Sequence, residues 1–127
     1  MKITSEQELA DLVAAARGPV AVQGGGTRGV GMTGQVADLS GLSGVTLYEP
    51  GALTLVVRAG TALAEVEALL AREGQRLAFE PADWRGLLGT GGEPTIGGVV
   101  AANIAGPRRV QAGAARDALL GVRFVDG

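Results

Sequence analysis

The sequence contains no cysteine and no histidine. Without cysteine the chain forms no disulfide and offers no thiol nucleophile, which fits a reducing compartment such as the cytoplasm. Without either residue, a zinc site or a nucleophile activated by histidine lacks its usual side chains, so we expect no metal site. Any chemistry must therefore come from backbone amides, a few polar side chains and the molecules that they bind.

Aromatic side chains and positive charge are also scarce. Aromatic residues make up 3% of the chain, Lys2 is the single lysine, and the formal net charge is −2. Because nucleic-acid binding relies on base stacking or on a basic face, we expect no nucleic-acid partner. The sequence also has no apolar run of about 18 residues and no signal-peptide pattern at its start, so no membrane span is expected.

Glycine is the residue that the chain has in excess. It accounts for 22 of 127 residues, more than twice the ordinary share of about 7%. The glycines are clustered and follow no fixed period, which excludes a collagen-like chain. The length suffices for one domain with a hydrophobic core. The clusters are therefore the features most in need of a physical explanation.

The first cluster follows a short apolar strand at 20–23 and reads Gly24-Gly25-Gly26-Thr27-Arg28. Because glycine has no Cβ, successive N–H groups can turn toward one point and form a site for a phosphate or pyrophosphate. The hydroxyl of Thr27 and the guanidinium of Arg28 can add further donors. This segment is a candidate anion-binding loop.

Three kinds of phosphate loop fit this cluster to different degrees. The spacing Gly24-x-Gly26-x-x-Gly29 satisfies the dinucleotide fingerprint, but that motif opens a helix and needs an acid about 20 residues later. Residues 30–34 are poor helix formers, and Asp38 comes too early. A P-loop requires a lysine that this segment lacks. We favour a pyrophosphate loop without a following helix, and a tight turn between strands remains the alternative.

The hydrophobic pattern predicts an α+β fold of small strands and covering helices. Ser5 and Glu8 form a capping box for a first helix. Thr61 is expected to cap a second helix that runs through Glu73, with Gly74 just beyond its end. Strands are expected at 20–23, 36–39, 45–49, 53–59, 75–79 and 117–125, and the Pro50-Gly51 turn makes a hairpin of the third and fourth.

A second glycine-rich region begins at Gly86, and within it Gly97 to Asn103 is expected to form one short helix. The N-terminal amides of that helix can face an anion. Close packing of the helix on a sheet, which small residues also permit, is an equal alternative. The pair Asp126-Gly127 is a hairpin signal without its second strand, so we expect the N-terminal piece of a longer protein or a partner that supplies the strand.

Four motifs follow one another along the chain: Val22-x-Gly-Gly-Gly-Thr27, Arg58-Ala-Gly-Thr61, Thr95-Ile-Gly-Gly-x-x-Ala-x-Asn103 and Asp117-x-Leu-x-Gly-Val122. Their order resembles the FAD-binding domain of the vanillyl-alcohol oxidase/p-cresol methylhydroxylase (PCMH) superfamily. The further motifs Tyr48-Glu-Pro50, Phe79-Glu-Pro81, Ala105-Gly-Pro-Arg-Arg109 and Gly113-x-x-Arg116-Asp117 resemble, within that superfamily, the FAD-binding subunits of glycolate oxidases.

The resemblance implies that residues 1–127 are an incomplete FAD-binding PCMH-type domain, with a small mixed sheet flanked by helices and the start of a second lobe. The FAD should be non-covalent, because the histidine or cysteine often used for attachment is absent. It implies no catalytic residue that can be named here. Its cofactor-binding positions are Gly24, Gly25, Gly26, Thr27, Arg28, Pro81, Thr95, Gly97, Gly98, Ala101, Asn103 and Gly106, and Gly25 is expected to need a positive φ.

The resemblance further implies a flavoprotein oxidoreductase that acts on glycolate or another small 2-hydroxy acid, as one nucleotide-binding subunit of a glycolate oxidase-like complex. A cytoplasmic location is expected, with membrane association through partner subunits as a variant. One alternative is another FAD-linked enzyme of the superfamily, such as an aldonolactone oxidase or a reductase of cell-wall precursors. Another is a non-catalytic structural subunit whose glycine loops are only turns.

Overall fold

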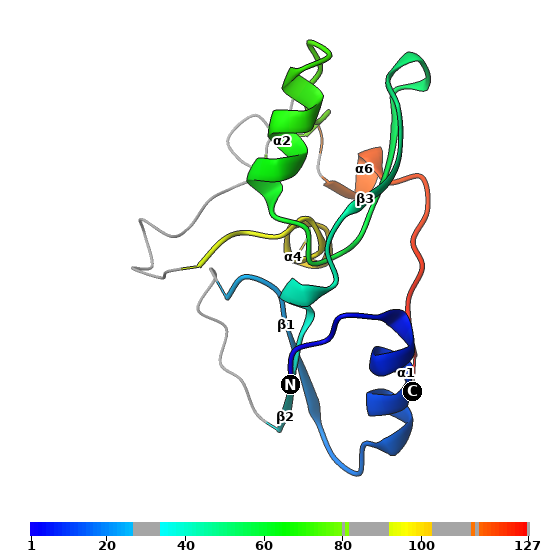
Figure 1. Cartoon of the computed structure of the whole chain (residues 1–127), viewed down its shortest axis with the longest axis vertical. Helices are drawn as coiled ribbons and strands as arrows, with labels where there is room; N and C mark the ends of the chain where they lie inside the picture. The colour runs from blue at the N-terminus through cyan, green and yellow to red at the C-terminus, as the bar shows by residue number, and fades with distance from the viewer. Residues whose placement is uncertain (27–33, 80, 82–91, 103–112, 114, 127) are drawn as a thin grey trace.

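The computed structural model describes residues 1–26, 34–79, 81, 92–102, 113 and 115–126. Figure 1 shows α1 with β1 and β2 in one half of the molecule, α2 with the β3–β4 hairpin in the other, and α4 between them. The α+β fold is confirmed, although the strands form two separate two-stranded sheets. The described elements are α1 (Glu6–Ala15), β1 (Val20–Gln23), β2 (Gln35–Asp38), η1 (Leu39–Gly41), β3 (Val45–Glu49), η2 (Pro50–Ala52), β4 (Thr54–Val57), α2 (Leu63–Ala71), α4 (Ile96–Ala102) and α6 (Ala115–Ala118).

The first helix begins with a capping arrangement close to the expected one. The hydroxyl of Ser5 accepts a hydrogen bond from the N–H of Glu8 at 3.2 Å. The carboxylate of Glu8 reaches back to the N–H of Thr4 at 2.8 Å, one residue before the N-cap, and also bonds the hydroxyl of Thr4. These donors lower the pKa of Glu8, chiefly through the Thr4 backbone N–H. The Ser5 half of the predicted capping box is confirmed, whereas Glu8 bonds the N–H of Thr4 in place of the N–H of the N-cap residue.

The first sheet is a parallel pair. Strand β1 pairs with β2 in a register that puts Gln23 opposite Asp38, so the last residues of the two strands lie side by side. Residues 1–3 run along the other edge of β2, where Ile3 N–H donates to the Asp38 carbonyl at 2.7 Å. Below this sheet lies one core cluster, formed by Ile3, Leu12 and Ala37, with Leu9, Val20 and Leu39 packed against it.

The second sheet is the predicted hairpin. Strands β3 and β4 are antiparallel with an irregularity between Val45 and Leu47. Their turn is η2 followed by Leu53 at φ 52°, the one described non-glycine residue with a positive φ. β4 is shorter than the expected 53–59 because its last residues turn toward α2. A second core cluster lies beside this hairpin and consists of Leu63, Phe79, Ile96, Val99 and Ala115, with Val57 and Leu77 against it.

The expected capping role of Thr61 is wrong. Helix α2 starts after Ala62, and no side chain caps it. Thr61 is fully buried, and its hydroxyl accepts from the Gly44 N–H at 2.9 Å and donates to the Gly44 carbonyl at 3.3 Å. A buried hydroxyl needs a partner, and the backbone of a distant loop supplies it here. Helix α2 ends at Ala71 and not at the expected Glu73. Gly74 lies in the turn that follows, with the positive φ of 63° for which glycine is suited.

Two expected strands are also wrong. Residues 75–79 have no regular secondary structure, because Leu77 and Phe79 pack into the second core cluster instead of pairing in a sheet. The Gln75 side chain contacts the hairpin, because it accepts a hydrogen bond from the Tyr48 hydroxyl at 2.6 Å and donates one to the Pro50 carbonyl at 2.8 Å. Alternating apolar residues were therefore a sign of burial and not of a strand.

The segment expected as a strand at 117–125 starts instead within helix α6, and residues 119–126 follow without strand pairing in the described part. A strand needs a neighbour for its N–H and C=O groups, and none of the described strands flanks this segment. It runs back toward α1 (Figure 1), where the Arg123 guanidinium bonds the Glu6 carboxylate at 2.7 Å. Its exposed large apolar side chains are Leu119, Leu120, Val122 and Phe124.

Candidate functional site

A cleft of about 360 Å³ lies where the two halves of the molecule meet. Four segments contribute to it: the end of β1, the end of β2 with η1, the loop between β4 and α2, and the residues before α4. Its volume is typical of a site for a small ligand or part of a larger one. The described residues that line it are Gln23, Gly24, Gly25, Asp38, Ser40, Gly60, Ala62, Gly92, Glu93 and Thr95.

The first glycine segment forms one wall of the cleft through close contact with the residues before α4. A Cβ added to Gly24 would overlap the Thr95 hydroxyl, and one added to Gly25 would overlap the Glu93 carbonyl oxygen. Gly26 has a φ of 68°, but Gly25 is not among the glycines with positive φ. The expected reason for glycine at position 25 is therefore wrong, because the position requires space and not a left-handed backbone.

The N–H groups of this segment are the feature that points to a ligand. In the part of the chain that the structure describes, the N–H groups of Gly24, Gly25 and Gly26 donate to no protein acceptor. Gly24 and Gly25 are half-buried, and backbone donors in such positions are normally paired with protein or water. Three consecutive donors at a cleft can serve an anion such as a pyrophosphate.

The second glycine segment uses its N–H groups differently. Thr95 is buried, and its hydroxyl accepts from the Gly98 N–H at 3.2 Å at the start of α4. The Gly97 N–H donates to the Ala59 carbonyl at 2.8 Å, and a Cβ on Gly97 would come within 2.7 Å of the Ala59 Cβ. The helix at 97–103 is confirmed over Ile96–Ala102. Of its two interpretations, close packing is the one that the contacts of Gly97 and Gly98 support.

The structure brings only part of the predicted cofactor set together. Gly24, Gly25 and Thr95 line the cleft, and Gly26 continues the first segment as an exposed residue. Gly97 and Gly98 lie behind Thr95 in α4, whereas Ala101 is exposed on the last turn of that helix. Pro81 is half-buried and does not line the cleft. Thr27, Arg28, Asn103 and Gly106 lie outside the described residues, so their roles stay predictions.

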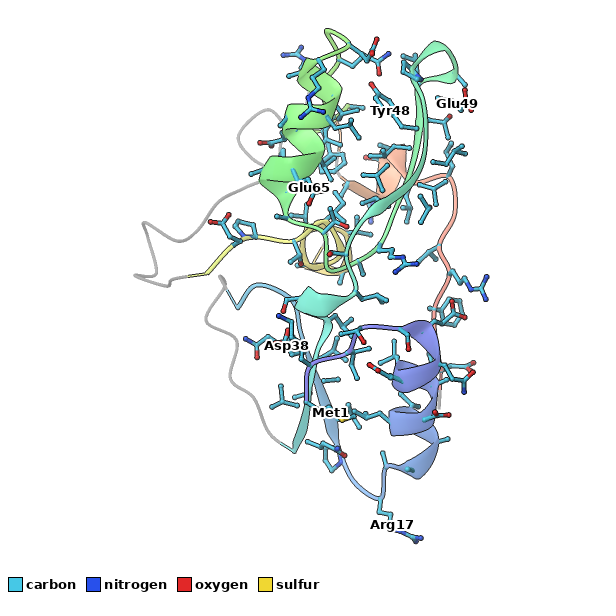
Figure 2. The ribbon with its side chains drawn as sticks, viewed as in Figure 1. Met1, Arg17, Asp38, Tyr48, Glu49 and Glu65 are labelled. Carbon is cyan, nitrogen blue, oxygen red and sulfur yellow. The ribbon has the colours of Figure 1, made fainter. Side chains whose placement is uncertain are left out.

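Sequence reasoning missed Asp38, Ser40 and Gln23. Asp38 lies at the end of the parallel pair, near the middle of the molecule (Figure 2), and its carboxylate accepts from the Ser40 N–H at 2.9 Å. This bond is the main reason that the pKa of Asp38 lies below its ordinary value, and the positive charges of Lys2 and the N-terminus lower it further. The rule that ligands bind at the carboxyl ends of parallel strands is the signal that could have found them.

The charge in the cleft is negative on the described side. Of the lining residues, Asp38 and Glu93 are charged, and both are acidic. A diphosphate in this cleft would therefore depend on the glycine N–H groups and on the predicted contact with Arg28. No three acidic side chains of the described part gather as a metal site would require. None of the helices within the same described ranges has the length and apolarity to cross a bilayer.

Comparison with known proteins identifies a family for this architecture. The family model described as "FAD binding domain" matches residues 1–127. A protein of Escherichia coli strain K12, named "Glycolate oxidase subunit GlcE", is 38% identical over 112 residues, which is 86% of this chain. The match covers 30% of that relative, so this chain spans less than a third of the relative's length.

Proposed function

This chain belongs to the FAD-binding domain family, and we propose that it is the FAD-binding part of a subunit of a flavin-dependent oxidoreductase that acts on glycolate or another small 2-hydroxy acid. The name of the bacterial relative supports the substrate class. The family match, which covers residues 1–127, supports FAD as the cofactor. FAD, when bound, supplies the redox-active ring that the side chains of this protein lack.

One observation carries the cofactor assignment to particular residues. The N–H groups of Gly24, Gly25 and Gly26 have no acceptor among the described residues, and Gly24 and Gly25 line the cleft. A diphosphate offers several acceptor oxygens and matches a row of such donors. The described residues therefore fit the group, and we assign the diphosphate of FAD to this segment.

The chain's own residues have binding and positioning roles in this proposal. The glycine amides hold the diphosphate, and Arg28 adds a charge-assisted bond to it. Thr95 supports this wall of the cleft, because its hydroxyl caps α4 while it lies against Gly24. The attachment of FAD is non-covalent, since the chain has no cysteine or histidine. No residue is assigned as a catalytic acid or base.

A titration of the purified chain with FAD, followed by flavin fluorescence and visible absorption, tests the cofactor assignment. Saturable binding near one equivalent is the expected result, and flavin released into the supernatant by acid precipitation would establish non-covalent binding. Absence of saturable binding by the chain, with its circular dichroism showing a folded protein, would contradict the proposal and favour a structural subunit.

The substrate is tested by adding candidate reductants to the FAD-loaded protein without oxygen. Loss of the visible flavin absorption with glycolate is expected, because a 2-hydroxy acid that is oxidised must reduce the flavin. Loss with an aldonolactone, or with reduced nicotinamide nucleotide, would instead identify another enzyme of the same superfamily. Loss with none of them would indicate a subunit that serves electron transfer or assembly.

The same proposal places this chain beside other subunits in a cytoplasmic complex, which associates with a membrane only through its partners. The word "subunit" in the relative's name supports the presence of partner subunits. Co-purification of the tagged protein from its native cells, with a stable mass larger than its own, is the expected result. A monomer that forms no stable complex would contradict the partner assignment and leave FAD binding unaffected.

A further inference from the structure

We propose that the Asp38 carboxylate binds hydroxyl groups of the sugar part of the cofactor, beside the glycine N–H groups that bind its diphosphate. The inference rests on the proposed function, because it assigns a second part of the same ligand. It concerns a residue outside both glycine segments. The hydroxyl groups belong to either the adenosine ribose or the ribityl chain, which share this chemistry.

The position of Asp38 follows from the parallel pairing of β1 and β2. The register sets Gln23 opposite Asp38 at the carboxyl edge of the pair. The first glycine segment leaves β1 at this same edge, and both Asp38 and Gly24 line the cleft. Ligands of parallel sheets bind outside this edge. A molecule held by the glycine N–H groups therefore has Asp38 as a close neighbour.

The hydrogen bonding of Asp38 leaves acceptor capacity for a ligand. Its Oδ1 atom accepts from the Ser40 N–H at 2.9 Å, and the Ser40 hydroxyl is a second donor beside the carboxylate. An ionised carboxylate has about four acceptor positions, so two donors leave room for others. The side chain is half-buried. An ionised carboxylate accepts hydrogen bonds only, so it attracts hydroxyl groups and repels phosphate oxygens. The cleft thus has two chemically different parts, N–H donors for the diphosphate and a carboxylate for hydroxyl groups.

The charge of the cleft supports this division. The charged lining residues in the described part are Asp38 and Glu93. A site that received only phosphate groups would be expected to present neutral donors or cations at its walls. Bonds to sugar hydroxyls would explain why a carboxylate lies beside a dinucleotide. In other dinucleotide sites, an acidic residue at the end of a neighbouring strand makes such bonds.

A purely structural role for Asp38 makes a different prediction. Its side chain caps the turn η1, and asparagine caps such turns about as well as aspartate. Asp38→Asn therefore preserves the cap and removes the charge. A capping role alone predicts unchanged ligand affinity, whereas the proposal predicts a loss of affinity for ligands that carry the sugar hydroxyls.

Isothermal titration of Asp38→Asn with FAD, ADP, dideoxy-ADP and FMN is the decisive experiment. Asp11→Asn, an exposed residue of α1 that makes the same charge change far from the cleft, is the matched control. We expect FAD to bind Asp38→Asn about tenfold more weakly, because a bond to a charged group is worth about 1.5–3 kcal/mol. If the ribose is bound, ADP weakens and dideoxy-ADP does not. If the ribityl chain is bound, FMN weakens and ADP does not.

If Asp38→Asn and the unaltered chain bind FAD, ADP and FMN with equal affinity, the inference about Asp38 is overturned. The proposed function would still stand in that case, because the unaltered chain binds FAD. Failure of the unaltered chain to bind FAD would instead remove the proposed function. If Asp38→Asn does not fold, the unaltered chain still decides. It should prefer ADP to dideoxy-ADP, or FMN to its analogue with a hydroxyl-free alkyl chain, by about tenfold, and no preference in either pair contradicts the inference.

Discussion

The two segments are both rich in glycine, but their backbone N–H groups are used in opposite ways. In the first, the N–H groups of Gly24, Gly25 and Gly26 have no acceptor in the described part, and Gly24 and Gly25 line a cleft. In the second, the N–H groups of Gly97 and Gly98 bond the protein itself. One segment is open to a ligand, and the other joins α4 to the end of β4.

The difference shows that glycine in a cofactor-binding family does not by itself mark a cofactor contact. Gly25 and Gly97 both lack space for a Cβ, so a side chain at either position damages packing. Their backbone N–H groups differ, because only those of the first segment have no acceptor in the described part of the protein. Substitutions in the second segment should therefore act on stability, and substitutions in the first should act on FAD affinity.

The largest effect is expected from Gly97→Val. The new side chain would meet the Ala59 Cβ and carbonyl oxygen, each 2.7 Å from the added Cβ, and overpacking of this kind costs about 1–3 kcal/mol or more. Urea unfolding should show the lower free energy of unfolding. Gly51→Ala, at a position with no atom within 4 Å of the new Cβ, is the control and should change it by less than about 0.5 kcal/mol. Equal stability of Gly97→Val and the unaltered chain would remove the packing role.

Gly25→Ala sharpens the comparison on the ligand side. Its Cβ overlaps the Glu93 carbonyl oxygen, so the first segment must shift away from the residues before α4. We expect FAD affinity to fall by about tenfold or more, equivalent to about 1.4 kcal/mol, as measured by fluorescence titration. Gly18→Ala, which meets no atom within 4 Å, should bind FAD normally. A Gly25→Ala variant of unchanged affinity would separate this segment from the cofactor.

Thr61→Val tests the loop that holds both segments in place. The Thr61 hydroxyl bonds the Gly44 N–H and carbonyl, and its own carbonyl accepts from the Ile96 N–H at 3.0 Å. Removing the buried hydroxyl should lower the free energy of unfolding by about 1–2 kcal/mol. Thr46→Val, whose hydroxyl bonds the Val56 carbonyl on an exposed face, should cost less. The reverse order in thermal unfolding would be inconsistent with the burial of Thr61.

The smallest effect is a pH dependence of stability from Asp38. Its pKa is lowered in the folded chain from an ordinary value of 3.8, first by the Ser40 N–H. A carboxyl group with a lowered pKa stabilises the fold above its ordinary value, and this contribution is lost as the pH falls through the folded value. Melting temperatures measured from pH 6 downward should therefore decline less below about pH 4 in Asp38→Asn than in the unaltered chain. Parallel curves of melting temperature against pH would indicate that the Asp38 carboxylate does not stabilise the folded chain.

Local features of the chain were predictable from the sequence. The cap at Ser5, the strands at 20–23 and 45–49, the hairpin and the positive φ of Gly74 after α2 follow from short-range rules, and each is present. The glycine clusters and the order of the motifs were sufficient for the family. These features depend on residues within a few positions of one another, so no knowledge of distant contacts was required.

Contacts between distant segments were decided only by the tertiary structure. Thr61 resembles a helix cap in sequence, but its hydroxyl is hydrogen-bonded to the backbone of Gly44. The large apolar residues at 75–79 are spaced as in a strand, but their side chains pack in the second core cluster. Gly25 needs glycine because Glu93 comes close to it, and Asp38 reaches the cleft because β1 and β2 pair in parallel. Each outcome depends on which segments meet in space, and burial and hydrogen bonding then override local preference.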